Sequence, residues 1–222
     1  MLVICTDDSV AENFARDLRS MLDEKVALLP MKEFNLYHSE ASSHDTEQRR
    51  IATLFALESG EARICVTSAQ SLIQKTTSPE NLKKMAFTIE SHGTYPPEDV
   101  LDALVRCGYT RSYQVEGRGQ YAQRGGIIDF FSPADDNPVR IEFWGDEIDT
   151  MAFFDIDSQR RMDNIESCRI LPAAEDETGI FACALDYIGE DALVFIDQAT
   201  KVADRVREYS KSLDIGLCLR EK

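Results

Sequence analysis

The pattern in which apolar residues are spaced changes at two points along this chain, and these two changes limit the folds that it can adopt. Up to about Met85, short apolar runs alternate with stretches in which apolar residues recur at helical spacing. Beyond Met85 the runs lie close together between turn-forming residues, and after Leu171-Pro172 the first pattern returns. The pattern predicts an α/β domain of residues 1–85 and 173–222 that is interrupted by an inserted domain of residues 86–172.

The first pattern predicts strands that alternate with helices. Thr6-Asp7-Asp8-Ser9 offers N-cap side chains to a helix over Ala11–Leu22, and a polar loop precedes a second helical stripe at Ile51–Leu57. A further helix is expected over Val202–Tyr209. The expected strands are Leu2–Cys5, Val26–Leu29, Arg63–Thr67 and Ala192–Asp197. This alternation indicates an open, mostly parallel sheet.

The middle region predicts an α+β domain built on an antiparallel β-meander. Pro96–Cys107 reads as a helix, because proline stands near its start and Gly108 lies just past its end. Gly125-Gly126 and Gly145-Asp146 are tight-turn sequences between apolar runs. The expected strands are Ala86–Glu90, Ile127–Phe131, Val139–Trp144 and Ile148–Phe154.

The chain is strongly acidic, with 40 Asp and Glu residues against 24 Lys and Arg residues and a formal net charge of -16. Nucleic-acid binding draws its affinity from clustered Lys and Arg, so this surface repels a phosphate backbone over most of its area. We therefore expect no direct binding of nucleic acid. The acidity has two open explanations, namely solubility and selection of a partner by charge.

The cysteines and the N-terminal residues indicate the cellular compartment. The six cysteines are scattered, with no close pair and no histidine at metal-ligand spacing, which favours reduced structural thiols. The opening MLVICT has no basic start and no small-residue cleavage site, and no apolar stretch approaches the ~20 residues that span a bilayer. These features predict a cytoplasmic protein without a membrane partner.

No pattern in the sequence points to a catalytic residue, a metal ligand or a cofactor. The phosphate-loop pattern G-x-x-x-x-G-K-[ST] is absent. His38, His44 and His92 lie far apart in polar segments, which favours solvated loop histidines over a triad or a zinc site. Adjacent acidic residues such as Asp135-Asp136 arise readily among 40 acidic residues. We expect a non-catalytic chain.

A candidate binding surface follows from strand alternation in Val139–Trp144. Successive side chains of a strand point to opposite faces, so Arg140, Glu142 and Trp144 share the face opposite to the apolar residues. The single tryptophan of the chain therefore stands on a polar face near an arginine, a combination enriched at interface hot spots. The alternative is that Trp144 covers a second small core or packs on the arginine stem.

The basic residues of the inserted region add to this surface. Between Ala86 and Pro172 every basic residue is Arg, and arginine's planar fork suits carboxylates and desolvated contacts better than lysine does. Arg124 precedes Gly125-Gly126, and it lies beside Arg140 if the two strands pair across the turn between Pro133 and Pro138.

Residues 108–172 also carry a resemblance to a known family. Its pieces, in this order and spacing, are QYAQRGGIIDFFSP, PVRIEFWGDEID, FDIDSQR and ILPA. They resemble the inserted domain that the bacterial transcription-repair coupling factors (Mfd) share with the excision-repair helicase UvrB. Two upstream segments resemble, more weakly, the flanking first domain of that family: LPMKEFNLYHSEASSHDTEQRRIATLFAL and ARICVTSAQSLIQK.

The resemblance implies a partner and a set of contact residues. In this family the inserted domain docks UvrA, the damage-recognition ATPase, and the surrounding α/β domain is helicase-like but has lost its ATP site. Arg124, Arg140 and Trp144 fall at family positions that contact UvrA, with Trp144 standing where phenylalanine is usual. With the neighbouring Glu142 they form the predicted partner-binding set.

The resemblance also implies a longer parent protein. Residues 173–222 are shorter than the family's second half of the α/β domain, so we expect a fragment. Its parent would be an ATP-driven DNA translocase that displaces stalled RNA polymerase and recruits nucleotide excision repair.

Three other functions stay open. A UvrB-like damage-verification helicase fragment needs a phosphate-loop lysine and an aromatic hairpin, and neither is found here. A metal-dependent enzyme that uses the acidic pairs predicts thermal stabilisation by millimolar Mg²⁺. A purely structural scaffold predicts that changing Trp144 alters stability rather than binding.

Overall fold

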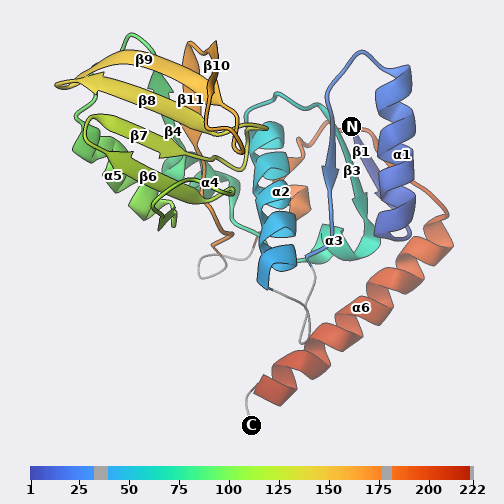
Figure 1. The fold of residues 1–222 in the computed structure, drawn as a ribbon. Coiled ribbons are helices and arrows are strands. Elements are labelled where there is room, and N and C mark those ends of the chain that lie inside the picture. The colour runs from blue at the N-terminus through green and yellow to red at the C-terminus, as the bar shows by residue number, and fades with distance from the viewer. Residues whose placement is uncertain (33–39, 177–181, 221–222) are drawn as a thin grey trace. The chain divides into compact units, whose positions relative to one another are not determined.

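A computed structural model describes residues 1–32, 40–176 and 182–220. The chain is a mixed α/β protein with a parallel four-stranded sheet and separate, mainly antiparallel sheets of six and two strands (Figure 1). It divides into two compact units. The first unit comprises Met1–Thr46, Thr53–Pro79 and Asp176–Lys222, and the second comprises Glu47–Ala52 and Glu80–Glu175.

The first unit is built on the parallel sheet, as the alternating pattern predicts. Its strands are β1 (Leu2–Cys5), β2 (Val26–Leu29), β3 (Ile64–Ser68) and β12 (Val194–Ile196), in the order β12-β1-β3-β2. Each neighbouring pair is parallel, and β1, β2 and β3 are largely buried apolar runs. A strand covered on both faces needs such an uninterrupted run.

Helices accompany this sheet. Helix α1 begins after Asp7, whose Oδ1 accepts the Val10 N–H at 3.0 Å, so the predicted N-cap is confirmed. α1 packs against β1, β2 and β3 through an apolar stripe that includes the fully buried Ala11 and Ala15. The helices of this unit are α1 (Asp8–Met21), α3 (Ala69–Ile73), the 3₁₀ turn η1 (Ala184–Tyr187) and α6 (Ala199–Arg220). Helix α2 (Glu40–Glu58) is divided, because its residues Glu47–Ala52 belong to the second unit.

Helix α2 corrects one expectation. The polar loop predicted before Ile51 is wrong over residues 40–50, because α2 already begins at Glu40. Glu, Gln and Arg are good helix formers, and in Glu47–Arg50 they supply polar contacts rather than an apolar stripe. His44 consequently lies on a helix and not in a loop, while His38 falls outside the described residues.

The second unit holds a six-stranded sheet in the order β10-β9-β8-β7-β6-β5. Its strands are β5 (Thr110–Arg111), β6 (Gln120–Arg124), β7 (Ile127–Phe130), β8 (Val139–Trp144), β9 (Glu147–Phe154) and β10 (Arg161–Asn164). The predicted meander is present in β6 to β9, and β10 extends it antiparallel to β9. The short β5 departs from the meander, since it runs parallel to β6.

Two tight turns connect strands of this sheet, and both need glycine. Gly125 between β6 and β7 has φ +60°, and Gly145 between β8 and β9 has φ +63°. Residues with a Cβ are strained in this left-handed region, whereas glycine is not. The next residue, Gly126, allows β8 to approach, because a Cβ there would lie 3.0 Å from the Phe143 carbonyl oxygen.

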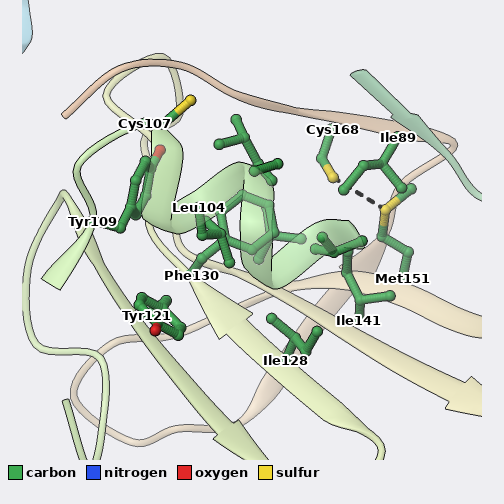
Figure 2. Close-up of a cluster of buried hydrophobic side chains, with 14 of the residues drawn as sticks. Ile89, Leu104, Cys107, Tyr109, Tyr121, Ile128, Phe130, Ile141, Met151 and Cys168 are labelled. Carbon is green, nitrogen blue, oxygen red and sulfur yellow. Dashed lines mark hydrogen bonds between the residues drawn. The ribbon is translucent and has the colours of Figure 1, made fainter. Parts of the chain in front are cut away.

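The remaining elements of this unit are α4 (Pro79–Met85), α5 (Pro97–Arg106) and a two-stranded antiparallel sheet of β4 (Phe87–Glu90) and β11 (Ser167–Ile170). Apolar side chains of α5, β4 and β11 share one core with the six-stranded sheet. Figure 2 shows Leu104 of α5 beside Phe130 of β7, and a dashed line between Cys168 of β11 and Met151 of β9. The two sulfur atoms of that contact are 3.3 Å apart. The core therefore lies on a single face of the meander.

The five cysteines whose side chains the structure describes are free thiols. Cys5, Cys65, Cys107 and Cys168 are buried, and Cys183 is partly buried. Burial raises the pKa of Cys5 to about 11 and that of Cys65 to about 12. A thiol with such a pKa stays protonated at neutral pH and is a weak nucleophile. Within the same residues, no helix combines the length and the apolarity that a bilayer crossing requires.

Candidate partner-binding surface

The face of the six-stranded sheet opposite to the core is polar near its centre. Val139 and Ile141 are fully buried and Phe143 packs on the same core, so the alternating residues of β8 point the other way, as predicted. Pairing places Arg140 directly opposite Asp129 of β7. It also places Glu142 opposite Ile127, which in turn faces Arg124 of β6. We call this side the outer face.

Asp129 joins the two arginines of the outer face. Its carboxylate accepts from Arg140 Nε at 2.7 Å and from Arg140 Nη2 at 2.8 Å, a bidentate arrangement. Arg124 Nη2 donates to the same carboxylate at 2.6 Å. The Asp129 side chain is only 1% exposed. Charge-assisted bonds of this kind are stronger than neutral ones and lock the geometry of the guanidinium groups.

The Arg140 guanidinium contacts two further groups besides Asp129. Its Nη1 donates to the Gln159 carbonyl oxygen at 3.3 Å, and its guanidinium lies 4.5 Å from the centre of the Phe154 ring. The hydrogen bonds that Arg140 donates to Asp129 are the main cause that raises the pKa of Arg140. Gln159 has φ +59°, an unfavourable conformation for a residue with a Cβ, and it presents its carbonyl oxygen to Arg140.

Glu142 and Trp144 continue the outer face toward the β8–β9 turn. Glu142 lies 4.0 Å from Arg161 Nη1 of β10, an exposed pair of small energetic weight. Trp144 is 81% exposed and pairs in register with Glu147 across the turn. The alternative that Trp144 covers a second small core is therefore wrong. Such a core exists, but it is formed by Val115, Ala122, Phe131, Phe154 and Ile156.

The structure brings the predicted residues onto one face, with different roles in the packing. Arg124 and Arg140 converge on one carboxylate, and Glu142 and Trp144 extend along the same strand as Arg140. Asp129 was missed by the sequence reasoning. The sequence contained one signal for it, namely an acid at an outward position within the apolar run Ile127–Phe131, on the strand that precedes the strand of Arg140. We call Arg124, Asp129, Arg140, Glu142 and Trp144 the outer-face cluster.

The acidic pairs do not assemble into a metal site within the described part of the chain. No group of three or more His, Cys, Asp or Glu residues there is placed to hold a metal ion. Asp135 is a different case, because its burial raises the pKa of its carboxyl to about 6. The charge of Asp136 acts in the same direction, whereas Arg169 and Arg118 oppose it.

The family comparison bears on this sheet directly. Residues 87–175 match the family described as the UvrB interaction domain. Residues 87–175 are a UvrB interaction domain. The UvrB interaction domain thus contains α5, the whole six-stranded sheet and every residue of the outer-face cluster. The resemblance predicted from the motifs between residues 108 and 172 is confirmed.

Curated relatives extend the similarity beyond the UvrB interaction domain. The chain is 34% identical over 190 residues to a transcription-repair-coupling factor of Mycobacterium bovis, a match that covers 79% of the chain. It is 30% identical over 182 residues, or 81% of the chain, to that of Haemophilus influenzae. It is 31% identical over 166 residues, or 74%, to that of Bacillus subtilis. These matches cover 14% to 16% of the relatives' own lengths.

Proposed function

We propose that this chain is a non-catalytic docking module that binds UvrA through the outer-face cluster of its UvrB interaction domain. One observation carries the proposal. Within the UvrB interaction domain, an 81% exposed tryptophan stands on the strand that also holds a fixed arginine. A large apolar side chain that is exposed to water beside oriented charges is typical of a protein interface rather than of a surface that binds no partner.

The charge distribution supports a specific contact. Arg124, Asp129 and Arg140 together carry two positive charges against one negative charge, on a chain of formal net charge -16. Glu142, the other acid of the outer-face cluster, lies 4.0 Å from Arg161 Nη1. A small positive site on an acidic surface orients a partner that carries an acidic group, and the surrounding negative charge disfavours other approaches. Trp144 supplies the apolar contact area that such a polar site lacks.

The proposal extends to the architecture and to the whole protein. Residues 1–85 and 173–222 form, in this view, a helicase-like domain without a nucleotide site, into which residues 86–172 are inserted. The longer parent is an ATP-dependent DNA translocase of the cytoplasm that couples stalled RNA polymerase to nucleotide excision repair. The similarity to transcription-repair-coupling factors over about four-fifths of the chain supports this extension.

Calorimetric titration of the purified chain with UvrA of the same organism tests the proposal. We expect Trp144→Ala to weaken binding by about 2 kcal/mol or more, since central aromatic anchors dominate interfaces. The matched control is Tyr113→Ala, because Tyr113 is 91% exposed in the same domain but lies outside the cluster. We expect this control to bind like wild type.

Two outcomes would contradict the proposal. If wild-type chain does not bind UvrA, the family match describes the fold without the partner. If Tyr113→Ala weakens binding as much as Trp144→Ala, the docking surface lies elsewhere on the domain. Circular dichroism of each variant separates loss of binding from loss of fold.

A further inference from the structure

Arg140 has little left to offer a partner. Two of its nitrogens bind Asp129 at 2.7 and 2.8 Å, and the third binds the Gln159 carbonyl oxygen at 3.3 Å. One side of its guanidinium faces the Phe154 ring. The side chain is 17% exposed. An arginine whose three nitrogens are all engaged within its own domain acts as a support more readily than as a contact group.

Arg124 stands in the opposite situation. Only its Nη2 is bonded, to Asp129 at 2.6 Å, and no other hydrogen-bond partner of its side chain occurs within the described residues. Its side chain is 44% exposed. A guanidinium fixed at one corner keeps its remaining donors available in a set direction, which suits a carboxylate on a partner.

Asp129 accepts hydrogen bonds from both the engaged Arg140 and the exposed Arg124. Its carboxylate is 1% exposed, and the strand register places it directly opposite Arg140. Arg140 fixes the carboxylate by a bidentate contact, and the fixed carboxylate then holds Arg124. The charge of Asp129 is balanced by one arginine, so the excess positive charge of the group resides on the exposed Arg124.

We infer that Asp129 is the positioning residue of the docking surface, that Arg140 acts through Asp129, and that Arg124 and Trp144 make the contacts. This inference rests on the proposed function and makes it more specific. The partner presents a carboxylate to Arg124 and an apolar surface to Trp144. Without Asp129 the two arginines repel each other, and Arg124 loses its fixed direction.

The first test needs no partner. In an NMR spectrum of the ¹⁵N-labelled chain, we expect the Nε–H signal of Arg140 to be visible and slow to exchange, because that donor is held by a buried carboxylate. Arg140→Lys assigns the signal by removing it. Asp129→Asn should abolish the slow exchange, whereas Asp163→Asn, which changes an exposed acid of β10, should leave it intact.

The second test measures binding to purified UvrA by calorimetry. We expect Arg124→Ala and Asp129→Asn each to weaken binding by about tenfold or more. The double variant should weaken binding by clearly less than the product of the two single effects, because both changes remove one oriented guanidinium. Asp163→Asn should bind like wild type.

Arg140→Lys supplies a second variant if Asp129→Asn does not fold. Lysine keeps the positive charge but cannot hold the carboxylate in a bidentate grip, so we expect binding to weaken by about tenfold. Wild-type affinity in this variant would mean that charge alone suffices, and the positioning role would be overturned.

The outcomes separate this inference from the proposed function. If Arg124→Ala and Trp144→Ala weaken binding but Asp129→Asn does not, UvrA docks here and Asp129 has no positioning role. If the wild-type chain does not bind UvrA at all, the proposed function is refuted, and the docking role of Asp129 is refuted as well. In that case the NMR result still reports whether the arginine geometry exists.

Discussion

Arg50 and Glu175 form a fully enclosed ion pair, in which Arg50 Nε donates to Glu175 Oε1 at 2.5 Å and neither side chain is exposed. The pair joins a turn of α2 to the last residue of the UvrB interaction domain match, 125 positions away. Glu47 and Gln48 of the same helix make two more hydrogen bonds to this domain. The Glu175 N–H donates to Glu47 Oε1 at 2.9 Å, and Gln48 Nε2 donates to the Arg118 carbonyl oxygen at 3.1 Å.

We expect Glu175→Gln to destabilise the chain by about 3 to 5 kcal/mol, because it removes one charge of an ion pair whose two side chains are fully buried. Urea unfolding followed by circular dichroism measures the change. Glu61→Gln is the matched control, since its pair with Lys25 is 3.2 Å long but exposed, and its loss should cost less than about 1 kcal/mol. Equal effects of the two changes would refute the enclosure of the Arg50 pair.

Trp144→Ala should leave the free energy of unfolding within about 0.5 kcal/mol of wild type, because the side chain is 81% exposed. Ile141→Ala, on the same strand but fully buried, should cost about 2 to 5 kcal/mol. Chemical denaturation of both variants distinguishes a binding role from the scaffold alternative. A large loss of stability in Trp144→Ala would favour the scaffold.

Asp135 should make the chain less stable as pH rises from about 4 to about 6. Burial raises its folded-state pKa to about 6, while an unfolded aspartate has a pKa of about 3.9, so the folded state binds more protons in this window. The stability lost is roughly 1 to 2 kcal/mol.

Asp135→Asn should remove that contribution, and its stability should therefore rise relative to wild type between pH 4 and 6. The comparison is made as the difference between the two proteins' unfolding free energies at each pH, which cancels the other carboxylates. Asp163→Asn, an exposed acid, is the control. Parallel stability curves for wild type and Asp135→Asn would overturn the prediction.

The β6–β7 turn should tolerate no side chain at either glycine, for two different reasons. Gly125→Ala forces a Cβ into φ +60° and should cost about 1 to 2 kcal/mol. Gly126→Ala brings a Cβ to 3.0 Å from the Phe143 carbonyl oxygen and should cost about 1 to 3 kcal/mol.

Gly117→Ala is the control for both glycine variants, because no atom lies within 4 Å of the added Cβ and the backbone there is not left-handed. Urea unfolding should show this variant to be as stable as wild type, or slightly more stable because alanine restricts the unfolded chain. Tolerance of alanine at Gly125 would show that the turn has another conformation in solution.

Several features of the fold and of the surface could be predicted because they depend on neighbouring residues alone. The period of two in Val139–Trp144 settles which side chains share a face, and burial of Val139 and Ile141 agrees with it. Gly125 and Gly145 predict tight turns, because few other residues adopt the left-handed backbone conformation that both glycines have. Local steric rules of this kind act before any tertiary contact forms.

Other features were decided only by tertiary structure. That Asp129 holds both Arg124 and Arg140 depends on the register of three strands, and the enclosure of Arg50 by Glu175 joins residues 125 positions apart. The exposure of Trp144 likewise depends on which side chains the second small core recruits. The sequence by itself determined faces and turns, because these follow from backbone geometry. The partners of buried charges were left to the topology, because a charge pairs with whatever group the folded chain brings within reach.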